Sequence, residues 1–99
     1  MRALLLENIH PEAVRLLGER GIEVGTAKGA LDSDELISAL DGVQLLGIRS
    51  KTTVTDEILA AAPDLLAVGA FCIGTNQIDL GAASERGIAV FNAPFSNTR

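Results

Sequence analysis

Short apolar runs alternate along this chain with segments of helical periodicity, and this alternation constrains the fold more than any other feature. The runs are bounded by polar residues or glycine and cover residues 3–6, 22–25, 43–48, 66–68 and 89–91. Strands that alternate with helices form repeated βαβ units, which place the strands side by side in a parallel sheet. The pattern therefore predicts an α/β fold with five parallel strands.

The segments between the apolar runs carry helix start and stop signals. A proline at a first-turn position, or a side chain that can accept a hydrogen bond from the backbone, marks where each helix begins. The expected helix starts or caps are Pro11, Ser33, Thr55 and Asp79, and the expected stops are Gly18 with Gly21, Asp41 with Gly42, and Gly87. With 99 residues there is room for one modest core. The prediction is a flavodoxin-like or Rossmann-like sheet with helices on both faces.

Charge and composition exclude several classes of function. Eight Lys and Arg against 13 Asp and Glu give a net charge of -5, which disfavours binding to nucleic acid or to an anionic membrane surface. No apolar stretch approaches the ~20 residues that a membrane helix needs. The single cysteine, Cys72, has no partner for an internal disulfide, which is typical of a reducing cytoplasm.

Polar residues follow the expected strands, and parallel strands bring such residues to one edge of the sheet. Ligands gather at this edge because loops converge there. The segments are 7–8, 49–52, 71–76 and 92–94. Arg49, Ser50 and Lys51 could bind a phosphate or carboxylate through charge-assisted hydrogen bonds worth roughly 1.5–3 kcal/mol each. An ordinary solvated loop is the alternative interpretation of these three residues.

Other candidate motifs are weaker. The segment from Gly69 to Gly74 has the spacing of half a phosphate loop, but Thr75 and Asn76 follow where that motif requires Lys and Ser or Thr. No G-x-G-x-x-G occurs, so the segment has no dinucleotide fingerprint. His10, the only histidine, is interpreted as a cap or surface residue, and Cys72 as a packed small hydrophobe. The sequence offers no pairing of a nucleophile with a base.

Three consecutive motifs make the chain recognisable. They are LGIRSKT at 46–52, FCIGTNQIDL at 71–80, and GIAVFNAPFSNTR at 87–99. In this order and at this spacing they closely resemble the D-isomer specific 2-hydroxyacid dehydrogenase family, and within it the D-3-phosphoglycerate dehydrogenases. The resemblance covers nearly the whole chain. One departure is that many relatives carry arginine and extra glycines in the loop at 69–74.

The resemblance implies roles for particular residues. Arg49 would bond the anionic end of the substrate, Lys51 stands where some relatives carry a second cation, and Ser50 would add a hydroxyl contact. The backbone of Ile73 and Gly74 would offer N–H groups to the substrate carboxylate. Asn97 and Thr98 match the start of a helix that leads toward the cofactor domain, near the nicotinamide end of NAD.

The resemblance also implies an activity for a larger protein. Residues 1–99 would be the first part of the substrate-binding domain of an NAD-dependent dehydrogenase that oxidises 3-phosphoglycerate to 3-phosphohydroxypyruvate in serine biosynthesis. The NAD-binding domain and the catalytic residues would lie outside the chain, which alone is expected to be inactive and to expose an apolar face. The parent enzyme is expected to be a cytoplasmic homo-oligomer. It would take a small anionic substrate.

Several alternatives remain at this point. The same family includes enzymes for unphosphorylated D-2-hydroxy acids and nicotinamide-sensing corepressors, and a non-catalytic binding or assembly module is also possible. A phosphoacceptor signalling domain shares the alternating architecture. It needs an aspartate after the third strand, where this chain has Arg49, and that cation is incompatible with a magnesium–carboxylate site.

Overall fold

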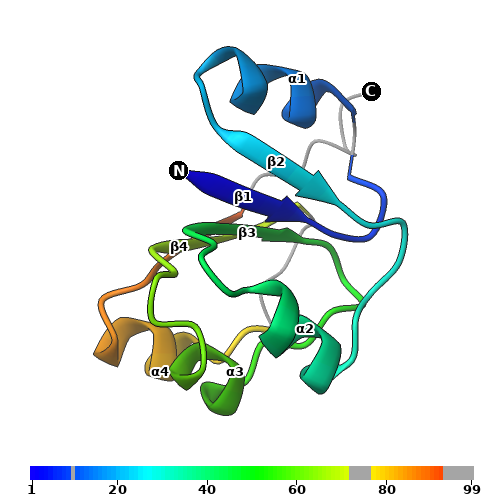
Figure 1. Cartoon of the computed structure of the whole chain (residues 1–99). Coiled ribbons are helices and arrows are strands. Elements are labelled where there is room, and N and C mark those ends of the chain that lie inside the picture. The colour runs from blue at the N-terminus through cyan, green and yellow to red at the C-terminus, as the bar shows by residue number, and fades with distance from the viewer. Residues whose placement is uncertain (10, 72–76, 93–99) are drawn as a thin grey trace.

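The computed structural model describes residues 1–9, 11–71 and 77–92, and strands and helices alternate through all three segments (Figure 1). The strands are connected by short helices, as βαβ units require. In chain order the elements are β1 (Arg2–Leu5), α1 (Pro11–Glu19), β2 (Glu23–Thr26), α2 (Ser33–Ala39), β3 (Leu45–Ile48), α3 (Asp56–Ala60), β4 (Ala67–Ala70), α4 (Leu80–Glu85) and β5 (Ala89–Asn92).

The five strands form one parallel sheet in the order β2-β1-β3-β4-β5. Strand β1 pairs with both β2 and β3, so the chain changes its direction of winding between these two neighbours. This confirms the predicted flavodoxin-like α/β sheet. The strand boundaries differ from the expected ones by a residue or two, most clearly at β4, which excludes Leu66 and extends to Ala70. Leu66 is 57% exposed and so does not belong to the buried run.

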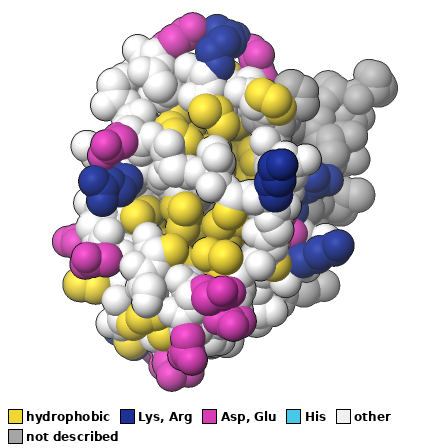
Figure 2. Space-filling view, turned by 45° about the vertical axis from the view of Figure 1, so that its right-hand side comes forward, with side chains coloured by type: hydrophobic (Ala, Val, Ile, Leu, Met, Phe, Trp, Pro, Cys, Tyr) yellow, Lys and Arg dark blue, Asp and Glu magenta, His cyan; other side chains and the backbone are white. Residues whose placement is uncertain are grey.

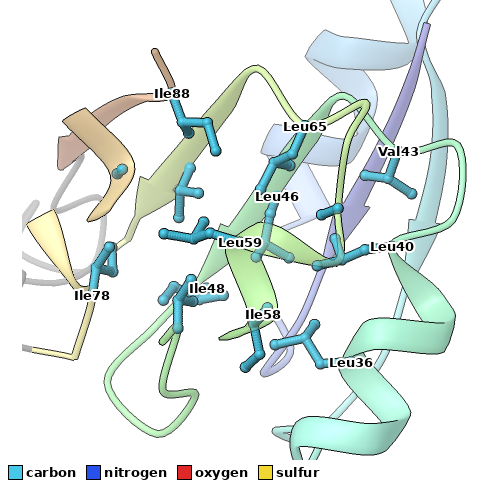
Figure 3. Close-up of a cluster of buried hydrophobic side chains, with 14 of the residues drawn as sticks. Leu36, Leu40, Val43, Leu46, Ile48, Ile58, Leu59, Leu65, Ile78 and Ile88 are labelled. Atoms are coloured by element: carbon cyan, nitrogen blue, oxygen red, sulfur yellow. The ribbon is translucent and has the colours of Figure 1, made fainter. Parts of the chain in front are cut away.

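Helices cover both faces of the sheet, but unequally. Helix α1 lies on one side, whereas α2, α3 and α4 lie on the other (Figure 1). The larger core is formed on the three-helix side, where the labelled side chains of Figure 3 converge from β3, α2, α3 and the ends of the neighbouring strands. The smaller cluster, under α1, contains Leu5, Ile9 and Ala13. Both faces of a parallel sheet are normally apolar, as here.

An apolar groove of about 190 Å³ lies beside α1, where no further helix of the described residues covers the sheet. Gly47 and Gly69 are register partners on β3 and β4. A Cβ on Gly69 would lie 2.8 Å from the ring of Phe91, and one on Gly47 would lie 3.0 Å from the ring of Phe71. The two glycines therefore let aromatic rings lie directly against the strands. Phe91 remains 45% exposed and lines the groove.

Side-chain caps fix where the helices begin. Thr55 accepts a hydrogen bond from the Ile58 N–H, and Asp79 accepts one from the Ala82 N–H, as the sequence predicts. The expected cap at Ser33 is wrong, because Ser33 is the first residue of α2 and Asp32 precedes it as the cap. The Asp32 carboxylate accepts from the Glu35 N–H at 2.9 Å, and the Glu35 carboxylate accepts from the Asp32 N–H at 3.2 Å. This reciprocal capping box satisfies two backbone donors at once.

Asp32→Ala is expected to lower the free energy of unfolding by about 1 kcal/mol, because the substitution leaves the first turn of α2 without its acceptor. In a domain of this size, 1 kcal/mol corresponds to a fall in Tm of roughly 4–8 °C. Ser33→Ala is the matched control and should change the stability by less than about 0.5 kcal/mol. Thermal unfolding followed by circular dichroism compares the two. Equal losses would contradict the assignment of Asp32 as the cap.

Candidate functional site

A polar pocket of about 270 Å³ opens where β1, β2 and β3 end. Its lining residues are Glu7 after β1, Lys28, Gly29 and Ala30 after β2, and Arg49, Ser50 and Lys51 after β3. The arrowheads of these three strands point to the same side of the sheet (Figure 1). In a sheet of this strand order, the point at which the winding reverses lies between β1 and β3, and ligands favour the crevice outside it. The pocket therefore occupies the position that the topology favours for a ligand.

Three cationic side chains surround this pocket. Arg49 is half-buried, while Lys28 and Lys51 are exposed. Ion pairs between described residues involve Arg2, Arg15 and Arg86, and none of them uses a cation of the pocket. Figure 2 shows several Lys and Arg side chains on the right, and others at the top and left that lie beside Asp or Glu side chains. The pocket thus presents positive charge to an anion on a chain whose net charge is -5.

Lys28 was not predicted as a site residue. The loop that carries it runs beside the end of β1, where the Asn8 N–H donates to the Ala27 carbonyl at 3.1 Å and the Glu7 N–H donates to the Gly29 carbonyl at 3.3 Å. These bonds hold Lys28 opposite the loop after β3. In the sequence, Lys28 lies just past the second apolar run. This position indicates a place at the pocket only when β2 and β3 are known to flank β1.

Glu7 is a carboxylate inside this basic pocket, and it is 8% exposed. Its Oε2 accepts from the N–H groups of Arg49 at 2.8 Å and Thr52 at 3.0 Å, and its Oε1 accepts from the Lys51 N–H at 2.8 Å. Burial alone would raise the pKa of Glu7, but the nearby Thr52 side chain and the three backbone donors outweigh it and lower the pKa. The Thr52 hydroxyl is buried near this carboxylate, although it makes no well-formed hydrogen bond within the described segments.

Gln77 reaches the same loop from the chain that follows β4. Its side-chain Nε2 donates to the Arg49 carbonyl at 2.8 Å. The backbone beside it is anchored, because the Val54 N–H donates to the Gln77 carbonyl at 2.8 Å and the Asp79 N–H donates to the Val54 carbonyl at 2.9 Å. No local pattern in the sequence predicts that Glu7 or Gln77 holds this loop. Glu7 lies 42 positions from Arg49 in the sequence and Gln77 lies 28 positions from it, and the fold brings both side chains against the Arg49 backbone.

Arg49, Ser50 and Lys51 all line this one pocket. The other predicted contacts, from Ile73, Gly74, Asn97 and Thr98, lie outside the described residues, as do His10 and Cys72. Across the described segments, no cluster of three or more His, Cys, Asp or Glu side chains could hold a metal ion. No helix among these segments is long and apolar enough to cross a membrane.

Comparison with known proteins places the chain among dehydrogenases. Residues 3–99 match the model of the D-isomer specific 2-hydroxyacid dehydrogenase catalytic domain. The whole chain is 50% identical to D-3-phosphoglycerate dehydrogenase 2 of Saccharomyces cerevisiae and spans 21% of that protein. It is 52% identical over 100 aligned positions to the D-3-phosphoglycerate dehydrogenase of Haemophilus influenzae, of which it spans 24%. The chain thus corresponds to about a fifth to a quarter of these relatives.

Solved structures share the same fold. The TT0316 protein from Thermus thermophilus superposes with a TM-score of 0.83 at 31% identity, over 91% of this chain and 29% of that one. An NAD+-bound 3-phosphoglycerate dehydrogenase of Entamoeba histolytica gives a TM-score of 0.81 at 21% identity, over 93% of this chain and 32% of that one. The match to the family model covers nearly every residue. The chain therefore belongs to the D-isomer specific 2-hydroxyacid dehydrogenase family.

Proposed function

We propose that this chain is the substrate-recognising part of an NAD-dependent D-3-phosphoglycerate dehydrogenase, and that its basic pocket binds the phosphate end of 3-phosphoglycerate. The main support for the proposal is that one small pocket at the ends of β1, β2 and β3 is lined by three cations, Lys28, Arg49 and Lys51. The relatives with about 50% identity bear the name of this enzyme, which supports the choice of substrate. The reaction would be the oxidation of 3-phosphoglycerate to 3-phosphohydroxypyruvate, in serine biosynthesis.

The charge of the pocket favours a phosphorylated substrate over a simple hydroxy acid. A phosphate monoester carries about −1.5 to −2 charge at pH 7 and three acceptor oxygens. The three cations and the Glu7 carboxylate give the pocket a formal charge of three positive minus one negative, close in size to that of the phosphate, and the Ser50 hydroxyl adds a further donor. A carboxylate alone would leave cations of the pocket without a partner. We therefore assign the pocket to the phosphate and leave the substrate carboxylate to donors elsewhere, for which the Ile73 and Gly74 N–H groups are our candidates.

The described residues do not fit NAD. The turn that follows β1 contains the buried Glu7 carboxylate where a dinucleotide fold would need a glycine-rich loop, and the chain has no G-x-G-x-x-G. A carboxylate that accepts three backbone N–H groups leaves those groups unable to bind a pyrophosphate. We propose that NAD is held by another part of the parent protein, with Asn97 and Thr98 near its nicotinamide end.

The proposed role of this chain is binding, and no residue of it is assigned a catalytic step. Acid–base chemistry would come from other parts of the parent enzyme, which correspond to the portion of the longer relatives that this chain does not match. We further propose that the parent enzyme is a homo-oligomer and that it is cytoplasmic, the latter in keeping with the single cysteine.

Isothermal titration of the full chain with 3-phosphoglycerate and with D-glycerate tests the proposal directly. The two compounds differ only in the phosphate, so the proposed site should bind the first at least ~10-fold more tightly, since one charge-assisted hydrogen bond is worth roughly 1.5–3 kcal/mol. Equal affinities would overturn the phosphate assignment and favour another D-2-hydroxy acid. Absence of binding to both compounds would favour a module without this substrate site.

Arg49→Gln is expected to weaken binding of 3-phosphoglycerate by roughly 10–100-fold. The substitution keeps polar reach but removes the half-buried guanidinium, which can form two parallel charge-assisted bonds to a phosphate. Arg20→Gln is the matched control because it removes the same charge from an exposed turn that does not line the pocket. Titration of both variants measures the difference. A similar loss in both would show that net charge, and not the pocket, governs the affinity.

A further inference from the structure

We propose that Glu7 and Gln77 are positioning residues, which fix the backbone of the loop at 49–52 so that Arg49 and Lys51 present their side chains to the ligand. The inference rests on the proposed anion-binding function of the pocket and deepens it. It concerns two residues that supply none of the positive charge of the site but determine where that charge lies.

Glu7, which follows β1, binds the backbone of the loop at 49–52. Its two carboxylate oxygens accept three backbone N–H groups, one before Ser50 and two after it, with N···O distances of 2.8, 2.8 and 3.0 Å. Donors on both sides of Ser50 converge on one side chain, which can happen only if the loop curves around the carboxylate. The side chains of Arg49 and Lys51 take no part in these bonds. They remain available to a ligand while their backbone is held.

Gln77 holds the loop from the side of β4. Its amide donates to the Arg49 carbonyl at 2.8 Å, whereas the Arg49 N–H donates to Glu7. Both polar groups of the Arg49 backbone are therefore bound by side chains from two other segments of the chain. Gln77 is itself anchored through the parallel bridge between Val54 and Ile78. The direction in which the Arg49 side chain leaves the loop is thus set from both sides.

The backbone of Glu7 supports a dedicated role. Its φ of 62° lies in the left-handed region, and Asn8 follows with a φ of 56°. Such a conformation is unfavourable for a non-glycine residue and persists only where the surroundings hold it. Here the Glu7 N–H donates to Gly29 while the carboxylate accepts from the loop after β3. The strained residue links the loops that carry Lys28 and Arg49, the two cations on opposite sides of the pocket.

A positioning role and a purely electrostatic role of Glu7 predict opposite effects of Glu7→Gln on the affinity for the ligand. A carboxylate that lines a pocket for anions should repel the ligand, so its neutralisation should tighten binding if charge alone mattered. If Glu7 instead shapes the loop, its replacement should weaken binding, because an amide cannot accept three N–H groups with its single oxygen. Gln77→Met removes the donor to the Arg49 carbonyl at nearly constant shape and introduces no charge.

The experiment is titration of the full chain and its variants with 3-phosphoglycerate, after circular dichroism has confirmed folding. We expect Glu7→Gln and Gln77→Met each to weaken binding by ~3–10-fold, whereas Gln44→Met, which alters an amide at the opposite edge of the sheet, should leave the affinity unchanged. Tighter or unchanged binding by Glu7→Gln and Gln77→Met would overturn the proposal. If Glu7→Gln does not fold, Gln77→Met alone decides.

Amide hydrogen exchange separates this inference from the proposed function. In the ligand-free chain, exchange at residues 49, 51 and 52 should accelerate by at least ~10-fold in Glu7→Gln relative to the unsubstituted chain. If the unsubstituted chain binds no 3-phosphoglycerate, the proposed function fails, and faster exchange still supports Glu7 as the residue that orders the loop. Unchanged exchange would refute that role whether or not the ligand binds.

Discussion

Leu46→Ala is expected to lower the free energy of unfolding by about 3 kcal/mol, within the ~2–5 kcal/mol that such core truncations cost. Leu46 lies on β3, has no exposed surface, and belongs to the larger of the two cores (Figure 3). Its side chain packs at the centre of a sheet between two paired neighbours, so the surroundings cannot collapse into the space that alanine leaves. Folded domains are stable by only ~5–15 kcal/mol, so the loss is a large fraction of the whole.

Urea unfolding measures this effect and offers a matched control. With an m-value of ~1–3 kcal/mol/M, a loss of about 3 kcal/mol lowers the midpoint by roughly 1–3 M. Leu66→Ala makes the same chemical change at a side chain that is 57% exposed, and it should cost less than about 1 kcal/mol. Losses of the same size in the two variants would mean that β3 does not form the packed centre of the sheet.

The fold was predictable because two local signals agree along the chain. Apolar runs of strand length alternate with capped helical segments, and this alternation predicts the five-stranded parallel sheet that is observed. The errors arose where neighbouring residues offer similar local chemistry. Asp32 and Ser33 can both cap a helix, and Asp32 takes this role because Glu35 stands three residues beyond it and completes a capping box. Similarly, Leu66 extends an apolar run without being buried.

The candidate site was only partly predictable, for a related physical reason. Arg49, Ser50 and Lys51 are adjacent in the sequence, so their common position after a strand could be inferred directly. Lys28 required the knowledge that β2 lies next to β1, because no local pattern links it to Arg49. Glu7 was expected at this edge of the sheet, but its carboxylate accepts from residues 42 to 45 positions away. Contacts of this kind follow from topology and cannot be read from spacing.

Glu7→Gln is expected to cost about 2–3 kcal/mol of stability at pH 7, because hydrogen bonds to a charged group contribute ~1.5–3 kcal/mol each and the amide can replace only some of them. The penalty should depend on pH in a definite direction. The pKa of Glu7 in the folded chain lies below its ordinary value of 4.5. Between these two values the unfolded chain binds a proton that the folded chain does not, so acid favours unfolding.

The contribution of Glu7 is therefore complete above pH 4.5 and is lost as the pH falls through the lowered pKa of the folded state. Urea unfolding of the unsubstituted chain and of Glu7→Gln at a series of pH values isolates this contribution, because the other carboxylates are common to both proteins and cancel in the difference. The difference in stability between the two proteins should be constant from pH 7 to about 5.5 and should narrow below 4.5, since a protonated Glu7 resembles glutamine.

Glu85→Gln, at an exposed position in α4, is the control and should change the stability by less than about 0.5 kcal/mol at pH 7. A gap that stays constant down to the acid limit of folding would show that the Glu7 carboxylate gains nothing from the three N–H groups it accepts.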